Sequence, residues 1–314
     1  MNVLVLSKID AAQQSDLAAL LDRCAAADGH PALPEPQRMA LGRPDLGAAG
    51  ARVLLAIDRV DGGQGLVGCA VLSGASDGSM ALHVMIDPAW RSSGDIGATL
   101  IGQALAVVPP PRPVRLWVMR ASPTDDEAAR CLAFVPERDL LQMRVPLPLP
   151  DAVLSGTRQL ATRAFVPGQD DARWLAVNNR AFAGHPEQGD WTMAQLHDRL
   201  AADWVDLGGF LVADAPEGNG LLGSCWTKVH QSSQPVLGEI YVIAVDPSHH
   251  GQGWGRALTV AGLEWMAARG VPVGMLYTDA ANTAAVALYR ALGFEVDHVD
   301  RSYMRAGGGA APVS

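Results

Sequence analysis

The sequence has little lysine and no excess of positive charge. Lys8 and Lys228 are the only lysines among 24 basic residues, and 33 acidic residues give a net charge of −9. Because nucleic acids and anionic membrane surfaces attract basic proteins, this balance disfavours both as partners. We therefore expect a small-molecule partner.

Cysteine is also scarce, and long apolar runs are missing. Cys24, Cys69, Cys131 and Cys225 lie far apart, without a histidine at metal-ligand spacing, so we expect ordinary buried thiols and no metal site. No apolar segment approaches the roughly 18 residues that cross a bilayer. The start, MNVLVLSKID, lacks the basic residues and cleavage site of a secretory signal. These absences predict a cytoplasmic protein.

The length of the chain allows two domains. With 314 residues, 49% of them hydrophobic, it can bury two cores. Alternate prolines in Val145–Pro150, VPLPLP, remove backbone donors, so we expect neither a helix interior nor a central strand there. This segment predicts a boundary between domains 1–150 and 151–314.

Hydrophobic periodicity and turn residues predict the order of elements. In the first half we expect helices at Gln13–Ala27 and Gly97–Val107, and strands at Arg52–Asp58, Gly65–Leu72, Leu82–Ile86 and Val114–Met119. In the second half we expect helices at Asp171–Phe182, Thr192–Ala202, Gly255–Ala268 and Asn282–Ala291, and strands at Arg158–Ala164, Gly209–Ala213, Leu221–Val229, Glu239–Val245, Val273–Thr278 and Phe294–Val299. Strands and helices interleave in both halves, which predicts an α/β layer fold for each.

The segment Gly238–Arg256, GEIYVIAVDPSHHGQGWGR, is the most informative in the chain. An alternating apolar strand leads to an Asp-Pro turn, and Gly251, Gly253 and Gly255 space the loop that opens the next helix. Glycine lets backbone N–H groups converge on a pyrophosphate, because it has no Cβ and tolerates positive φ, and the helix N-terminus adds its dipole. Such a triplet also occurs in ordinary strand-to-helix turns, so alone it leaves both interpretations open.

The first half repeats this outline at Leu82–Gly97, LHVMIDPAWRSSGDIG. Placing Pro88 on Pro247, an offset of 159 residues, preserves the apolar strand positions but puts Met80 where the second half has Glu239. The first loop is also one residue longer, which displaces its backbone amides. The four tyrosines all lie in the second half: Tyr241, Tyr277, Tyr289 and Tyr303. If a carboxylate and a phenol carry the chemistry, the first half cannot be catalytic.

A second motif follows the glycine loop across one helix and one strand. In Asn282–Phe294, NTAAVALYRALGF, Asn282 can cap a helix on which Tyr289 lies two turns further along the same face. Together with V-x-P-x-x-x-G-x-G-x-G, this motif resembles the Gcn5-related N-acetyltransferase family. The resemblance implies two tandem domains, each a mixed, mostly antiparallel sheet flanked by helices. It also implies acetyl-CoA as co-substrate.

The same resemblance assigns the cofactor contacts. The implied residues are Ile243, Ala244, Val245, His250, Gly251, Gln252, Gly253, Trp254, Gly255, Arg256, Asn282, Thr283, Ala284, Ala285, Val286 and Ala287. A second acetyl-CoA, bound without turnover, is implied at Val84, Met85, Ile86, Ser92, Ser93, Gly94 and Gly97. His250 stands where the family usually has Gln or Arg, so a backbone contact is expected there rather than a charged one.

Acetyl transfer from a thioester to an amine needs a neutral amine and a stabilised thiolate. An α-amine is only about one-tenth neutral at pH 7, so a base is useful, and Glu239 is the candidate, directly or through a water. Tyr289 is the candidate acid or hydrogen-bond donor for the thiolate. The competing interpretations are a solvent-facing acid at a strand end for Glu239 and a packed aromatic for Tyr289.

Three further segments narrow the expected substrate. Arg180–Trp191 (RAFAGHPEQGDW), Ser224–His230 (SCWTKVH) and the start of GEIYVIAVDP resemble a tandem-domain branch of the family that acetylates the cysteinyl amine of Cys-GlcN-Ins. The implied substrate contacts are Glu187, Lys228, Glu239 and Tyr277, with Glu35 a looser match. Each of these residues also has a structural interpretation, as a solvated loop acid, a strand-edge charge or a core residue.

Two other functions remain open from the sequence. One is an acetyltransferase of the same fold that acts on an aminoglycoside, a polyamine or a peptide amine. The other is an acyl-CoA sensor without catalysis. For the enzyme that acetylates Cys-GlcN-Ins we expect a monomer.

Overall fold

The computed structural model divides the chain into two compact units. It describes residues 1–28, 31–34, 37–38, 41–42, 46, 51–60, 63–75, 77–92, 95–184, 188–216, 218, 220–231 and 233–307. Unit 1 comprises Met1–Asp139 and Val299–Ser314, and unit 2 comprises Leu140–His298. These limits differ from the predicted ranges 1–150 and 151–314, because two long strands, β6 (Val135–Pro146) and β12 (Glu295–Arg305), each begin in one unit and end in the other.

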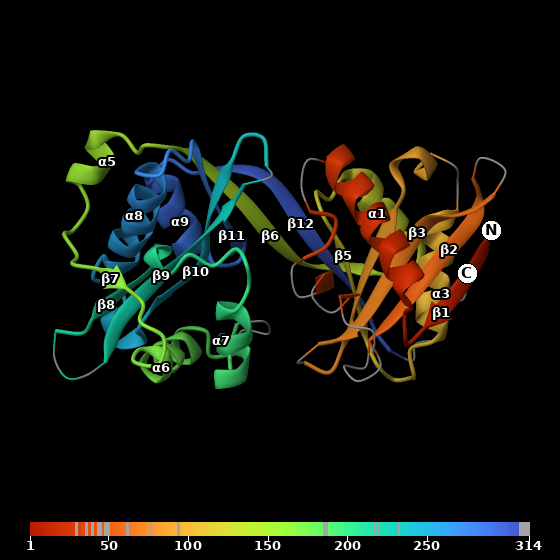
Figure 1. The fold of residues 1–314 in the computed structure, drawn as a ribbon, viewed down its shortest axis with the longest axis horizontal. Helices are drawn as coiled ribbons and strands as arrows, with labels where there is room; N and C mark the ends of the chain where they lie inside the picture. The colour runs from red at the N-terminus through yellow and green to blue at the C-terminus, as the bar shows by residue number, and fades with distance from the viewer. Residues whose placement is uncertain are drawn as a thin grey trace. The chain divides into compact units, whose positions relative to one another are not determined.

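Unit 1 is a sheet between helices. Its strand order is β1 (Asn2–Leu6), β2 (Arg52–Val60), β3 (Gly63–Gly74), β4 (Met80–Ile86), β5 (Val114–Val118) and β12. β4 and β5 are parallel and the other neighbours are antiparallel. Helix α1 (Ala11–Asp28) packs on one face, and α3 (Ile96–Ala106) and α4 (Pro123–Cys131) pack on the other (Figure 1).

Unit 2 repeats this plan. Its strand order is β6, β11 (Val273–Asp279), β10 (Leu237–Val245), β9 (Leu221–His230), β8 (Phe210–Asp214) and β7 (Arg163–Ala164). β10 and β11 are parallel, while β6–β11, β9–β10, β8–β9 and β7–β8 are antiparallel. The helices are α5 (Asp151–Ser155), α6 (Asp171–Ala181), α7 (Met193–Leu200), α8 (Trp254–Ala267) and α9 (Thr283–Ala291).

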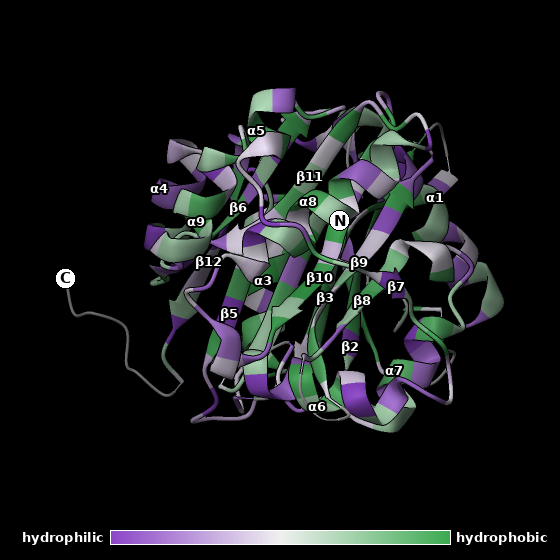
Figure 2. Cartoon of the chain, turned by 90° about the vertical axis from the view of Figure 1, so that its left-hand side faces the viewer, coloured by the Kyte–Doolittle hydropathy of each residue, from purple (hydrophilic) through white to green (hydrophobic). Residues whose placement is uncertain are grey.

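Two apolar cores cover the faces of the unit 2 sheet. Leu258 and Leu263 of α8 pack on one face, together with residues of α9. Trp174 of α6 and Trp226 of β9 lie in the core under α6 and α7 on the other face. Hydrophobic colouring concentrates on the central strands, and polar colouring on the outward parts of the helices (Figure 2). A Cβ at Gly262 would lie 2.5 Å from Cys225 Sγ, so glycine there lets α8 approach the sheet closely.

Most of the predicted elements are confirmed, including the four helices of the second half. The strand predicted at Arg158–Ala164 is wrong except for its last two residues, and β1, α4, β6 and α5 were not predicted. The prolines of Val145–Pro150 do not exclude a strand: Val145 and Pro146 pair with β11 at the end of β6. A proline is tolerated there because few ladder hydrogen bonds follow it.

Two expectations about single residues are corrected. Tyr303 lies on the part of β12 that belongs to unit 1, fully buried, where it donates a 2.7 Å hydrogen bond to Asp126 Oδ1. Unit 1 therefore does contain a tyrosine, but this phenol is bound within its core. Cys131, expected to be buried, is exposed at the end of the polar helix α4, whereas Cys24, Cys69 and Cys225 are buried. Of the helices in the described part of the chain, none combines the length and hydropathy needed to cross a bilayer.

Candidate active site

Strands β10 and β11 are paired over their first halves and then separate. Their parallel ladder runs from Leu237–Val273 to Ile240–Leu276 and goes no further in the described residues. The pairing of β10 with β9 shifts register between Ile240 and Val242, so Tyr241 occupies a bulge. A bulge bends a strand and re-aims its side chains. The edge of β10 beyond Tyr241 is therefore available to pair with an extended ligand.

The loop after β10 has the backbone geometry of an anion cradle. Asp246 caps a short 3-10 helix, Pro247–His249, by accepting a hydrogen bond from Ser248 N at 3.0 Å. Gly251 and Gly253 have φ of 74° and 84°, and among the described residues no atom beyond the adjacent residues lies within 4 Å of a Cβ built at either position. Gly253 is also the N-cap of α8. Backbone N–H groups and a helix N-terminus can therefore meet an anion here without steric hindrance.

Several side chains of this loop are directed elsewhere. The ring of His250 contacts the carbonyl of Val245, with Nε2 3.0 Å from the oxygen. The guanidinium of Arg256 donates to Thr157 Oγ1 at 3.1 Å and to the carbonyl of Val153 at 3.1 Å. Trp254 is largely buried beneath the guanidinium of Arg158, whose Cζ lies 3.6 Å from the ring centroid. This loop therefore offers mainly its backbone to a ligand.

Helix α9 begins as its sequence predicts. The side chain of Asn282 accepts a hydrogen bond from Ala285 N at 3.1 Å, which confirms the cap. Thr283, Ala284 and Ala287 are exposed, while Ala285 and Val286 are half-buried. Tyr289, further along the helix, is 8% exposed. Burial raises the pKa of Tyr289 to about 12, so the phenol keeps its proton at neutral pH and can act as a hydrogen-bond donor.

Glu239 lies on β10 just before the strands separate. Its side chain is 13% exposed, and its Oε2 lies 2.7 Å from Nε2 of His230, whose side chain is 20% exposed. Lys228 on β9 is the register partner of Glu239. The Lys228 ammonium lies 4.4 Å from the ring centroid of Trp204 and 5.5 Å from that of Tyr241. Glu239 is therefore a largely buried acid beside two other titratable side chains, which contradicts the interpretation as a solvent-facing strand end.

Tyr277 lies on the same sheet face, one strand away. The residue two before it on β11, Met275, is the register partner of Glu239, and strand residues two apart share a face. The Tyr277 hydroxyl accepts a 2.7 Å hydrogen bond from Gln142 Nε2, and Arg144 Nε donates to Gln142 Oε1 at 2.8 Å. The structure therefore places Lys228, Glu239 and Tyr277 on one sheet face.

Four predicted contact residues lie outside the described residues. They are Glu35, Glu187, Ser93 and Gly94. Their proximity to the other site residues stays a prediction. Within the described part of the chain, no group of three His, Cys, Asp or Glu side chains could hold a metal ion.

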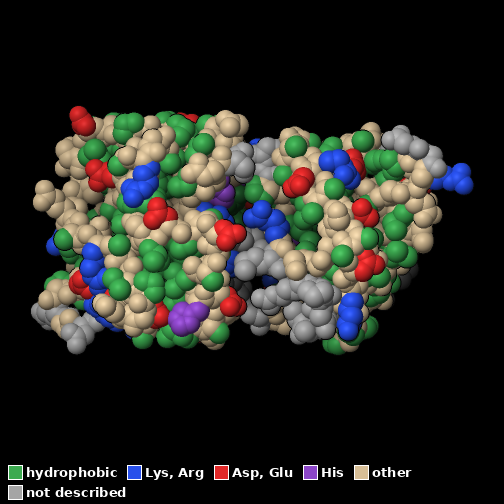
Figure 3. Space-filling model, viewed as in Figure 1, with side chains coloured by type: hydrophobic (Ala, Val, Ile, Leu, Met, Phe, Trp, Pro, Cys, Tyr) green, Lys and Arg blue, Asp and Glu red, His purple; other side chains and the backbone are tan. Residues whose placement is uncertain are grey.

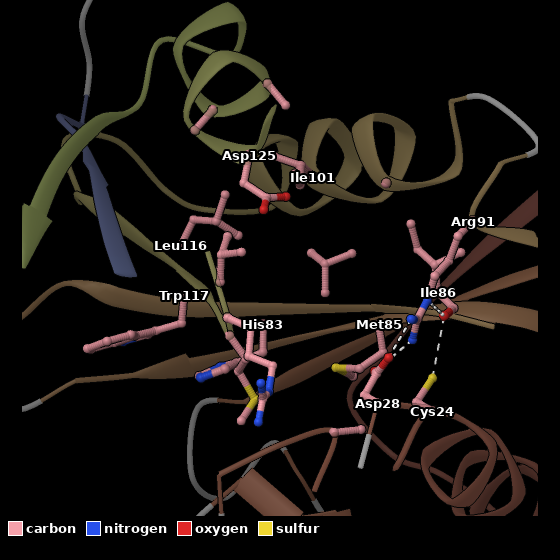
Figure 4. A pocket seen from close by; sticks show the side chains of 18 of the residues that line it. Cys24, Asp28, His83, Met85, Ile86, Arg91, Ile101, Leu116, Trp117 and Asp125 are labelled. Carbon is pink, nitrogen blue, oxygen red and sulfur yellow. Dashed lines mark hydrogen bonds and ion pairs between the residues drawn. The ribbon is translucent and has the colours of Figure 1, made fainter. Parts of the chain in front are cut away.

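Unit 1 has a cavity where its own parallel strands separate. The β4–β5 ladder ends at His83 and Trp117, without a bulge, and a cavity of about 610 Å³ follows. Figure 4 shows Asp125 of α4 and Ile101 of α3 across the cavity from these strands. Four residues predicted for the second cofactor site line the cavity: Val84, Met85, Ile86 and Gly97. Ser92, also predicted, is exposed in the turn before α3.

His83 is the most deeply buried polar group of this cavity. It is 4% exposed, its Nδ1 has no hydrogen-bond partner among the described residues, and burial lowers its pKa to about 4. The imidazole is therefore neutral at physiological pH. Unit 1 thus has a polar group, His83, beside its cavity. The position that corresponds to Glu239 is occupied by the apolar residue Met80.

Comparison with known proteins identifies the family. Residues 174–294 match the model of the acetyltransferase (GNAT) family. The mycothiol acetyltransferase of Streptomyces avermitilis is 40% identical over 307 residues, which cover 95% of this chain and 93% of that protein. That of Rhodococcus jostii is 37% identical over 306 residues, covering 95% and 97%. The chain belongs to the mycothiol acetyltransferase family. This confirms the resemblance to Gcn5-related N-acetyltransferases.

Solved structures agree with the fold of this mycothiol acetyltransferase family member. A Gcn5-related N-acetyltransferase from Sphaerobacter thermophilus has a TM-score of 0.69 at 20% identity and covers 98% of this chain and 97% of its own. A tandem GNAT protein from the clavulanic acid biosynthesis pathway has a TM-score of 0.68 at 18% identity and covers 99% of both chains. The predicted fold class, tandem acetyltransferase domains with mixed sheets, is confirmed.

Sequence reasoning did not single out three residues at this site: Gln142, His230 and Arg180, whose Nε donates a hydrogen bond to Asp246 Oδ2 at 3.1 Å. The alternation within SCWTKVH places His230 on the face of Lys228, so a signal for His230 was present. Gln142 reaches Tyr277 from 135 residues away, through the pairing of β6 with β11. A pairing of that range has no local signature.

Proposed function

We propose that the chain transfers the acetyl group of acetyl-CoA to the cysteinyl amine of Cys-GlcN-Ins, the last step of mycothiol biosynthesis. The observation that carries this proposal is the identity of 40% to a mycothiol acetyltransferase along 95% of the chain. The geometry of unit 2 supports it, because a glycine cradle, a strand edge and a buried acid occur together there. Unit 2 contains most of the predicted catalytic domain 151–314.

The residues of unit 2 fit acetyl-CoA. Gly251 and Gly253 have positive φ angles and carry no Cβ, so the backbone of this loop can approach a pyrophosphate closely. The edge of β10 at Ile243–Val245 suits the pantetheine amides. The exposed first turn of α9, with Thr283 and Ala284, would border the other side of the acetyl-CoA site. Acetyl-CoA supplies an activated acetyl group as a thioester.

Glu239 is the base in this proposal. The acceptor amine is mostly protonated at neutral pH, so Glu239 takes a proton from it directly or through a water. The backbone N–H near Val245 is the proposed donor to the developing oxyanion. Tyr289, with its pKa raised to about 12, stabilises the leaving thiolate by donating a hydrogen bond. The raised pKa makes complete proton transfer from the phenol unfavourable.

The substrate contacts suit a polyhydroxylated molecule. Lys228 and Tyr277 present an ammonium and a phenol on the face that holds Glu239, and both groups bond hydroxyls. Glu35 and Glu187 are proposed as further substrate contacts. A strand-edge role for Lys228 is less consistent with its burial at 8% exposure beside the ring of Trp204.

The unit 1 cavity is proposed to hold a second acetyl-CoA that is not turned over. Its position at the separation of β4 and β5 matches that of the proposed cofactor edge in unit 2. The absence of an acid at the position of Glu239 supports a non-catalytic role.

The proposed enzyme is a cytoplasmic monomer that binds neither nucleic acid nor membranes. Its net charge of −9 disfavours binding to nucleic acids and anionic membranes. On the face drawn in Figure 3, acidic and basic side chains are interspersed. Neither observation favours a polyanionic partner.

The test is a comparison of acceptors. CoA release should be measured with acetyl-CoA and either Cys-GlcN-Ins, an aminoglycoside, a polyamine or a peptide amine. We expect the highest kcat/KM with Cys-GlcN-Ins. Equal rates with the other amines would contradict the substrate assignment, and acetyl-CoA binding without turnover of any acceptor would favour the sensor.

A further inference from the structure

Glu239 has a hydrogen-bond partner on the neighbouring strand. His230 ends β9 and pairs in register with Leu237, so it lies diagonally across from Glu239 on the same face. The 2.7 Å separation of His230 Nε2 and Glu239 Oε2 is that of a good hydrogen bond. Both side chains are largely shielded from solvent, at 20% and 13% exposure.

The direction of this bond follows from chemistry. An ionised carboxylate can only accept hydrogen bonds, so Nε2 of His230 carries the proton when Glu239 is charged. The bond fixes one carboxylate oxygen and the rotamer of the side chain, and leaves Oε1 to take a proton from the amine. Other charged side chains belong to the same sheet, in which β11 separates β6 and β12 from β10. They are Lys228 on β9, Arg144 on β6 and Asp297 on β12, and the last two form an ion pair at 3.2 Å.

We propose that His230 is a positioning residue for the reaction, which holds the Glu239 carboxylate so that Oε1 receives the amine proton. This inference rests on the proposed function, because it takes Glu239 to be the base. His230 acts through Glu239 and contacts no reacting atom. Removing its hydrogen bond should therefore slow the chemical step and leave acetyl-CoA binding unchanged.

The test compares two amides at position 230. In His230→Gln the amide nitrogen can occupy the place of Nε2, whereas in His230→Asn the shorter side chain places it near Nδ1, out of reach of Glu239. Because a general base contributes about 10²- to 10⁴-fold, we expect His230→Asn to lower kcat by about tenfold or more. His230→Gln should keep kcat within about threefold of the parent, since it retains a donor. The KM for the amine should change little in both.

A double-mutant cycle separates this role from a structural one. If His230 acts only through Glu239, His230→Asn in a Glu239→Gln background should lower kcat by no more than about twofold. His197 provides the matched control, because its Nε2 lies 2.8 Å from Asp171 on α6 in a second histidine–carboxylate pair. His197→Asn should leave kcat unchanged. Melting temperature and acetyl-CoA affinity establish that each variant is folded.

Three outcomes would overturn the proposal. The first is an unchanged kcat in His230→Asn. The second is an equal fall in kcat in the folded Asn and Gln variants. The third is that the falls in kcat caused by His230→Asn and Glu239→Gln are independent of each other in the double-mutant cycle. If Glu239→Gln itself keeps full kcat, the assignment of the base fails instead. A higher kcat/KM with other amines would overturn the assignment of Cys-GlcN-Ins as substrate and leave the role of His230 intact.

Discussion

Arg180 of α6 binds the carboxylate of Asp246, the residue that follows β10, with Nε 3.1 Å from Oδ2. Unit 1 repeats this pair, since Arg23 of α1 lies 2.7 Å from Asp87, which follows β4. In each unit the aspartate also caps a 3-10 helix at the Asp-Pro turn. A helix on one sheet face thus holds the turn that leads into the glycine loop.

Arg180→Gln should loosen the cofactor loop of unit 2. Burial by itself raises the pKa of Asp246, but hydrogen bonds from Ser248 and Arg180 outweigh it and lower the pKa to about 2. Because the folded pKa lies below the unfolded value, the stabilisation is complete above about pH 4 and is lost as pH falls through 2. The half-exposed Arg180 limits the loss at pH 7 to about 1 kcal/mol.

Urea unfolding at pH 7 and pH 3 checks this prediction. The variant should be less stable at pH 7 and should lose less stability than the parent on acidification. Its KM for acetyl-CoA should rise. Arg23→Gln is the matched variant in unit 1 and should leave that KM unchanged; a rise in both would contradict the assignment of the cofactor loop.

Glu239→Gln should lower kcat by about 10²-fold or more, because the amide cannot accept the amine proton. Acetyl-CoA affinity, measured by calorimetry, should be nearly unchanged, since Glu239 precedes the cofactor edge of β10. Glu264→Gln, an exposed acid on α8, is the control and should keep full activity. An unchanged kcat in Glu239→Gln would show that Glu239 is not the general base.

Tyr289→Phe should lower kcat by about tenfold or more, through loss of a hydrogen bond that forms in the transition state. Burial raises the pKa of Tyr289 to about 12, above the value of about 10 in an unfolded chain. The parent should therefore lose on the order of 2 kcal/mol of stability between pH 10 and 12 through this group, and the variant should not.

Rate measurements and alkaline unfolding curves test the two statements separately. Tyr303→Phe is the control for the rate, because Tyr303 bonds Asp126 inside unit 1. It should cost about 1 kcal/mol of stability and leave kcat unchanged. A fall in kcat in Tyr303→Phe as large as in Tyr289→Phe would point to a general loss of structure.

Gly97→Trp should fill the unit 1 cavity, since a Cβ there would already lie 3.2 Å from Ile86 Cδ1. We expect the number of acetyl-CoA molecules bound per chain to fall from two to one, with kcat preserved. Gly102→Trp is the control, because Gly102 is exposed on the same helix and, outside that helix, no described residue lies within 4 Å of a Cβ built there. Loss of turnover in a folded Gly97→Trp protein would show that unit 1 is needed for catalysis.

Local features of this site were predictable from sequence because short-range chemistry determines them. Asn282 caps α9 through a bond to a residue three positions away, and the duplicated Asp-Pro turns form within three residues. The positive φ of Gly251 and Gly253 follows from the same local rules. Motifs of this kind predict caps and turn geometry without knowledge of the tertiary structure.

Long-range features were not predictable in the same way. The bulge at Tyr241 depends on how β9 pairs with β10, and the contact between Gln142 and Tyr277 depends on β6 reaching β11. The prolines near Val145 indicated a boundary, but the strand that contains Val145 continues into unit 2. Strand partners are selected by the whole sheet, so turn residues alone could not locate the division.

The two shared strands impose an order on biosynthesis. β5 of unit 1 pairs with Arg301–Arg305 of β12, so one edge of β5 stays unpaired until these residues have been made. The segment Leu140–His298 is synthesised before them and can fold first. Unit 1 is therefore synthesised first but completed last, because more than 180 residues separate the end of β5 from its partner residues on β12. A gene fragment that ends at residue 150 would encode a sheet without its closing strand, with an edge open to aggregation.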